Sequence, residues 1–141
     1  MNLPISLEFF PTKTPEGAEK LRAARQQLYA LGPQFCSVTY GAGGSTRERT
    51  HDILRRMAAE SSLRPAGHIT CVSATQDEID QVLKDYWDAG VKRIVALRGD
   101  PTAGIGTRYA PHPGGYAYAS DLISGARRIA DFDISVGCYP E

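Results

Sequence analysis

A carboxylate interrupts the first apolar segment of the chain, in the stretch ISLEFFPTKTP that begins at Ile5. Alternate side chains of a strand face opposite ways, so Glu8 would lie on the face opposite to Leu7 and Phe9. Burying a carboxylate between two covered faces costs free energy unless the group is paired, protonated or used in chemistry. A carboxylate at a solvated strand edge carries no such cost. The stretch alone leaves both interpretations open, and a buried Glu8 would be a candidate for chemistry.

Polar or aromatic residues also lie at or near the ends of four further apolar runs. They are Thr39 and Tyr40 in FCSVTY, His68 and Thr70 in AGHITCV, Arg98, Gly99 and Asp100 after RIVAL, and Tyr139 in DISVGCY. No second His or Cys stands at metal-ligand spacing from His68, so we expect no metal site. A hydrogen-bonded core histidine is the alternative to a ligand-binding role.

Two short motifs each admit two interpretations. The glycine-rich turn YGAGGST, residues 40–46, can hold a phosphate with backbone N–H groups, but it lacks the GK[ST] of a P-loop and can equally be a flexible loop. The stretch LRGD, residues 97–100, contains a tripeptide known from cell adhesion. Because a strand leads directly into it and no secretion signal precedes it, we expect it to line the mouth of a ligand site.

Composition limits the class of protein. The chain has 141 residues, 42% of them hydrophobic, and its 16 basic and 16 acidic residues cancel, which is ordinary globular usage. We therefore expect neither nucleic-acid nor membrane partners. The three cysteines form no CxxC pair and lie in apolar runs, so we expect reduced core thiols. With no signal peptide and no apolar run of about 18 residues, we expect a cytoplasmic protein.

Five strand-like runs alternate with amphipathic helical segments. The expected strands are 4–10, 35–40, 66–72, 93–99 and 133–139. Thr14 followed by Pro15 predicts the start of the first helix. The pairs Ser45 with Glu48 and Thr75 with Glu78 predict capping boxes for the next two. A fourth helix is expected after Ser120 or Asp121, following a Gly- and Pro-rich stretch, residues 101–120, whose length is typical of a lid, a binding loop or a disordered segment.

This alternation predicts parallel βαβ units in a single α/β domain, residues 1–141. A doubly wound sheet would tend to carry GxGxxG after its first strand, where this chain reads EFFPTKTP. A (β/α)₈ TIM barrel instead has its chemistry at the carboxyl ends of many strands. The polar strand ends favour the barrel, of which this chain would supply roughly the first five β/α units.

The ordered motifs LEFFP, SVTYGAGG, RTHDIL, GHITC, DYWDAGVKRIVALRGD, YASDL and DFDISVGCYPE resemble the methylenetetrahydrofolate reductase family over nearly the whole chain. The resemblance implies a TIM barrel with FAD at its carboxyl-terminal face and an oxidoreductase of one-carbon metabolism and methionine biosynthesis. In such an enzyme NADH or NADPH reduces the flavin and leaves, and the flavin then reduces 5,10-methylenetetrahydrofolate to 5-methyltetrahydrofolate in a ping-pong cycle. It further implies a homo-oligomer when the protein is full length.

Carried onto this chain, the resemblance makes Glu8 the buried general acid that helps to open the imidazolidine ring of the folate. Asp100 would lie near the flavin and the pterin, where its charge stabilises a cationic iminium intermediate. The residues expected to bind the cofactor are Thr39, Tyr40, His68, Leu97, Arg98, Gly99, Asp100, Tyr118, Ala119, Ser120, Asp121 and Tyr139.

The resemblance covers the first five strands of the family barrel, so we expect the chain to be a fragment. Two alternatives stay open. A truncated half-barrel could bind flavin without turnover, and a related barrel could reduce the folate without flavin.

Overall fold

The structure, a computed structural model, describes residues 3–40, 47–60, 63–101, 103–104 and 106–138. Strands and helices alternate through these residues. In chain order they are β1 (Ser6–Phe9), α1 (Pro15–Tyr29), β2 (Phe35–Val38), α2 (Arg47–Glu60), β3 (Pro65–Thr70), α3 (Gln76–Asp88), β4 (Arg93–Leu97), α4 (Ala119–Ile129) and β5 (Asp133–Val136). All five predicted strands are present, and each ends before its predicted boundary.

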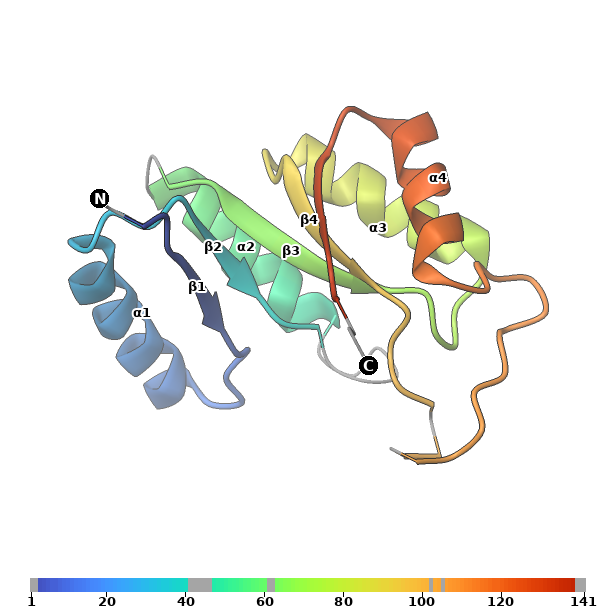
Figure 1. The fold of residues 1–141 in the computed structure, drawn as a ribbon. Coiled ribbons are helices and arrows are strands. Elements are labelled where there is room, and N and C mark those ends of the chain that lie inside the picture. Colours follow the sequence, from blue (N-terminus) through green and yellow to red (C-terminus); the bar gives the residue numbers. More distant parts are fainter. Residues whose placement is uncertain (1–2, 41–46, 61–62, 102, 105, 139–141) are drawn as a thin grey trace.

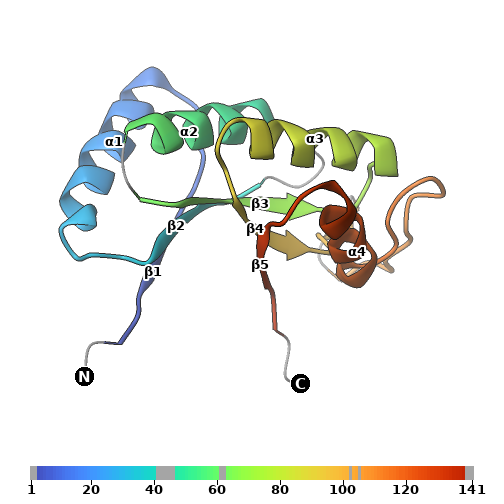
Figure 2. The ribbon, with the colours of Figure 1, turned by 90° about the horizontal axis from the view of Figure 1, so that it is seen from above.

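The strands form one parallel sheet in the order β1-β2-β3-β4-β5 (Figure 1). Helices α1, α2 and α3 cover the same face of this sheet, as Figure 2 shows, and α4 packs against α3 and β4. A doubly wound sheet has helices on both faces, with a reversal in its strand order. The fold is therefore α/β, with a singly wound parallel sheet, as the barrel interpretation requires of these five units.

Local hydrogen bonds start two of the helices where the sequence predicts. The Thr14 hydroxyl accepts a 3.0 Å bond from the Gly17 N–H, and Pro15 is the first residue of α1. At α3 the Thr75 hydroxyl accepts from the Glu78 N–H at 3.2 Å while the Glu78 carboxylate accepts from the Thr75 N–H at 2.8 Å. This confirms the capping box, and each such cap stabilises a helix by about 1 kcal/mol.

The fourth helix begins earlier than predicted. It starts at Ala119, with Tyr118 rather than Ser120 or Asp121 at the N-cap position. The Asp121 carboxylate accepts a 3.0 Å bond from the Tyr118 N–H, so the acidic residue caps the helix from within its first turn. The predicted start of the second helix at Ser45 lies outside the described residues, and α2 is described from Arg47.

The main core lies between the sheet and the covering helices. The strands contribute Cys36, Val38, Ile69, Ile94 and Ala96, and the helices contribute Leu54, Met57, Ile79, Leu83, Tyr86, Leu122 and Ala126.

The packing at Gly67 in β3 shows how tight this core is. A Cβ at Gly67 would lie 2.4 Å from the Tyr86 ring, and the Tyr86 hydroxyl donates to the His68 carbonyl at 3.1 Å. Of the three cysteines, all free, Cys36 and Cys71 are buried as predicted. The prediction is wrong for Cys138, which is exposed because it follows the end of β5.

Both outer strands of the described sheet pair on one side, β1 with β2 and β5 with β4. Apolar side chains lie exposed beside these edges, with Phe10 68% and Val136 53% exposed. Unpaired strand edges with apolar side chains promote association between chains. We expect the 141-residue chain, expressed alone, to self-associate as its concentration rises, which sedimentation velocity would measure.

Lysine at a sheet edge opposes pairing between chains. The double variant Phe10→Lys, Val136→Lys should therefore self-associate less, whereas lysine at the exposed helical residue Ala24 of α1 should change nothing. A wild-type chain that stays monomeric at all concentrations, with a sharp unfolding transition, would contradict this expectation.

Candidate active site

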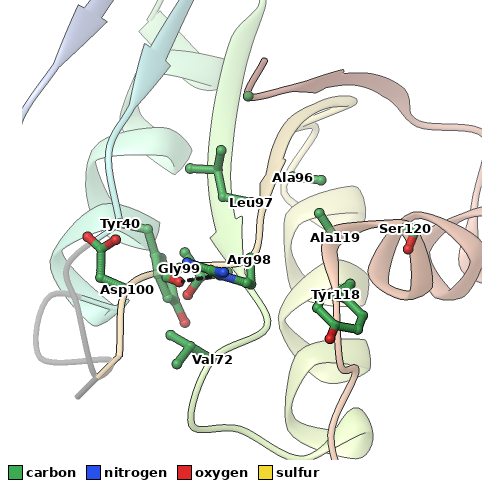
Figure 3. A pocket seen from close by; sticks show the side chains of 12 residues that line it. Tyr40, Val72, Ala96, Leu97, Arg98, Gly99, Asp100, Tyr118, Ala119 and Ser120 are labelled. Atoms are coloured by element: carbon green, nitrogen blue, oxygen red, sulfur yellow. Dashed lines mark hydrogen bonds between the residues drawn. The ribbon is translucent and has the colours of Figure 1, made fainter. Parts of the chain in front are cut away.

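A cavity of about 540 Å³ opens at the carboxyl ends of the strands. Four strand ends and the start of α4 contribute its lining. The lining residues are Tyr40 after β2, Thr70 and Val72 from the end of β3, Ala96, Leu97, Arg98, Gly99 and Asp100 from the end of β4, Tyr118, Ala119 and Ser120 at α4, and Gly137 after β5 (Figure 3). This volume falls within the range of about 300–1,000 Å³ of small-molecule and cofactor sites.

The turn that follows β4 forms one wall of the cavity. Gly99 has φ = +85°, and a Cβ there would lie 2.5 Å from the Cγ1 atom of Val72, so the position requires glycine on two grounds. The Arg98 carbonyl accepts bonds from the Val72 N–H at 3.0 Å and from the Cys71 thiol at 3.3 Å. The backbone of the LRGD stretch is thereby held against the end of β3.

Tyr40 is held from outside the cavity. Its hydroxyl oxygen accepts a 2.6 Å hydrogen bond from the Nε of Arg47, on the first turn of α2. Burial raises the pKa of Tyr40, and the nearby Arg47 guanidinium partly opposes that shift. The phenol therefore stays protonated at neutral pH and keeps its own O–H as a donor.

Eight of the predicted site residues line this one cavity. They are Tyr40, Leu97, Arg98, Gly99, Asp100, Tyr118, Ala119 and Ser120. Thr39 lies one residue before Tyr40, and its backbone is held by the Phe9 carbonyl and the Thr50 hydroxyl. Asp121 is at the helix cap described above and is not part of the lining. Tyr139 and residues 41–46 of the glycine-rich turn lie outside the described residues.

Three lining residues carry no signal in the sequence, namely Val72, Ala96 and Gly137. Each is small or apolar and lies two positions from a polar or aromatic residue at a strand end, namely Thr70, Arg98 or Tyr139. Thr70 was among the polar strand ends but not among the predicted cofactor contacts.

The Glu8 carboxylate lies within ion-pair distance of His68, with 3.1 Å between its Oε2 and the Nε2 atom of the ring. The contact lacks the alignment of a hydrogen bond. Strand β2 lies between β1 and β3, so the Glu8 side chain reaches across it. In the ladder His68 stands opposite Val95, one layer below the pair Thr70 and Leu97 that borders the cavity.

The expectation that Glu8 is buried is wrong for this structure, because 51% of its side chain is exposed. Glu8 lies on the sheet face opposite to Phe9, and α1, α2 and α3 cover the other face. His68, in the centre of the sheet, is buried as the alternative of a core histidine predicts, yet its ring nitrogen faces the carboxylate.

Burial lowers the pKa of His68, and the nearby Glu8 carboxylate partly opposes the shift. A histidine whose pKa is lower in the folded than in the unfolded chain takes up its proton preferentially on unfolding. Its contribution to the free energy of unfolding is therefore complete above about pH 6.5 and is lost as the pH falls below that value. Burial lowers the pKa of His51 as well.

We expect the wild-type chain to unfold at lower urea concentration at pH 5.5 than at pH 7.5, and His68→Gln to reduce this difference. Fluorescence of Trp87, packed on Phe132, reports unfolding at concentrations where the chain is monomeric. His112→Gln is the control, because that side chain is exposed. An unchanged difference in His68→Gln would show that the histidine does not set the pH dependence.

Two negative findings apply to the described residues. No helix among them is long and apolar enough to cross a membrane. Within the same residues, no three His, Cys, Asp or Glu side chains cluster closely enough to hold a metal ion.

Comparison with known proteins relates this chain to one family. The family model described as methylenetetrahydrofolate reductase matches residues 1–141. The chain is 44% identical over 137 residues to 5,10-methylenetetrahydrofolate reductase of Escherichia coli, covering 97% of this chain and 44% of that protein. It is 39% identical over 139 residues to methylenetetrahydrofolate reductase (NADH) 1 of Arabidopsis thaliana, covering 97% of this chain and 23% of that protein. The chain spans less than half the length of these relatives. It belongs to the methylenetetrahydrofolate reductase family.

Proposed function

We propose that this chain forms part of an oxidoreductase that reduces 5,10-methylenetetrahydrofolate to 5-methyltetrahydrofolate with electrons from NADH or NADPH, passed through FAD in a ping-pong cycle. The observation that carries the proposal is the cavity at the carboxyl ends of the strands, lined by Arg98, Gly99, Asp100 and the start of α4, in a chain of this family. Such an enzyme would act in cytoplasmic one-carbon metabolism and supply methyl groups for methionine.

We infer that in the complete enzyme the sheet closes into a (β/α)₈ barrel. Strands in chain order with helices on one face are what the first part of such a barrel requires. The uncovered face carries polar and charged groups, including the pair of Glu8 with His68 and the pair of Arg93 with Asp133. Closure would enclose this face, and Glu8 would then lie inside the barrel, below the cavity.

The lining residues fit a flavin. Gly99 lets its turn pack closely on Val72 beside the cavity, while the exposed Tyr118 and Arg98 offer an aromatic ring and a cation for the ring system and the phosphates. The flavin, when bound, supplies the hydride chemistry. Every other task falls to side chains of the protein.

Two carboxyl groups would then divide the chemistry on the folate. Protonated Glu8 would donate its proton to a nitrogen of the imidazolidine ring as the adjacent C–N bond breaks, which leaves a cationic iminium on the substrate. Asp100, at the cavity wall, would stabilise that cation by its negative charge.

The test uses a chimera in which this chain replaces the matching segment of the E. coli relative. We expect the purified chimera to release FAD on denaturation and to oxidise NADH when methylenetetrahydrofolate is supplied. Flavin without turnover would instead favour the non-catalytic flavin-binding module. A colourless but active protein would favour direct reduction of the folate by the nicotinamide.

A further inference from the structure

The segment that precedes α4, residues 106–118, has one partly buried side chain in its exposed half. We call this segment the strap. All residues from 106 to 114 are exposed except Tyr109, which is half-buried. A surface segment rich in Gly and Pro buries little apolar area and gains little free energy from packing. The few side chains that do pack therefore determine where it lies. Tyr109 is the side-chain anchor of this part of the strap, and at its far end the Gly114 carbonyl accepts a 2.9 Å bond from the Gln76 N–H.

Tyr109 contacts two residues of the cavity lining. The guanidinium carbon of Arg98 lies 4.5 Å from the centroid of its ring, a cation–π distance. The ring of Tyr118 lies beside it, with 6.1 Å between the centroids. Both of these partners line the cavity, whereas Tyr109 itself does not. It therefore supports the cavity wall from behind.

The hydroxyl of Tyr109 closes the strap on itself. It donates a 2.6 Å hydrogen bond to the carbonyl of Ala117, next to Tyr118. Burial raises the pKa of Tyr109 to about 12, and the neighbouring Cys71 thiol adds to the shift. The phenol thus stays protonated and remains a donor at neutral pH.

The Arg98 side chain needs such a support. Its backbone is fixed by bonds to β3, but its Nε has a long 3.3 Å bond to the adjacent Gly99 carbonyl and the residue is exposed. A long, exposed arginine loses much rotamer freedom when it must hold one orientation for a ligand. The Tyr109 ring restricts that freedom before any ligand binds, and it covers one face of the guanidinium while its N–H edges stay available to anionic oxygens.

We propose that Tyr109 is a positioning residue that presets the Arg98 guanidinium and the strap for an anionic, planar ligand of the cavity. The inference rests on the proposed function in taking FAD as the probe ligand. In this proposal Tyr109 affects ligand binding through Arg98, so its effect depends on the presence of the Arg98 side chain. The effect of a residue that only stabilises the fold would not depend on Arg98.

The first test is a double-mutant cycle on FAD affinity of the chimera. Tyr109→Leu should weaken FAD binding about 3- to 30-fold, the worth of one cation–π contact, whereas Tyr109→Phe should retain most of the affinity because the ring remains. In the Arg98→Ala background, Tyr109→Leu should have little further effect. Tyr116→Phe is the matched control, because Tyr116 lies in the same strap but bonds to Asp80 of α3 instead. Equal losses from Tyr109→Leu with and without Arg98 would overturn the proposal.

The second test needs no ligand and therefore decides the role of Tyr109 even if no variant binds FAD. Failure of FAD binding in every variant would overturn the proposed function alone. Hydrogen exchange of strap peptides, followed by mass spectrometry in the 141-residue chain, should speed up in Tyr109→Leu and in Arg98→Ala, and no further in the double variant. Tyr109→Phe, which keeps the ring and loses the hydroxyl bond to Ala117, should exchange at a rate between those of the wild type and Tyr109→Leu. Unchanged exchange in Tyr109→Leu, or additive increases in the double variant, would show that Tyr109 does not act with Arg98.

Discussion

Glu8→Gln in the chimera is expected to slow the reduction of methylenetetrahydrofolate by a factor of about 10² to 10⁴, the usual worth of a positioned acid. The substitution keeps the shape of the side chain and removes the transferable proton. Reduction of FAD by the nicotinamide needs no such donor and should continue near its normal rate. Stopped-flow measurement of each half-reaction separately, on folded and flavin-loaded protein, tests this separation.

A purely structural Glu8 predicts a different outcome. The substitution would then alter unfolding, with both half-reactions impaired together or neither affected. Glu19→Gln is the matched control, since Glu19 is an exposed glutamate of α1 on the covered side of the sheet. An unchanged folate half-reaction in Glu8→Gln would remove Glu8 from the chemistry.

Asp100→Asn is the second substitution with a large expected effect. Asp100 lies in the turn after β4 that forms one wall of the cavity, and its carboxylate is the acidic group among the lining residues. Losing this charge should slow the folate half-reaction by about 10² to 10³, the range for one electrostatic stabilising group. It should also raise the reduction potential of the bound flavin, because a nearby negative charge disfavours added electrons. Stopped-flow kinetics and a redox titration measure the two effects.

The control for this variant is Asp88→Asn, at the exposed end of α3, which removes a carboxylate outside the cavity lining. Flavin content should stay near the wild-type level in both variants. If Asp100→Asn leaves both the potential and the folate kinetics unchanged, the carboxylate has no part in the site.

The sequence by itself predicted the features that arise from short-range interactions. The cap of Thr14 on Gly17 and the capping box of Thr75 with Glu78 join residues three positions apart, so their geometry follows from local residue types. The gathering of Tyr40, Arg98 and Asp100 in one cavity was also predictable. In a parallel sheet all carboxyl ends lie at one edge, which brings strand-end residues together whatever the details of packing.

The tertiary structure decided what depends on contacts across the sheet and between loops. The register of β1, β2 and β3 sets Glu8 level with Ala66, and its side chain reaches His68 two residues further along β3. The exposure of Glu8 follows from which face the helices cover. The stacking of Tyr109 on Arg98 joins a Gly- and Pro-rich segment to a strand end. No periodic pattern predicts such a contact, because the conformation of an irregular segment is set by the few side chains that find a partner elsewhere in the fold.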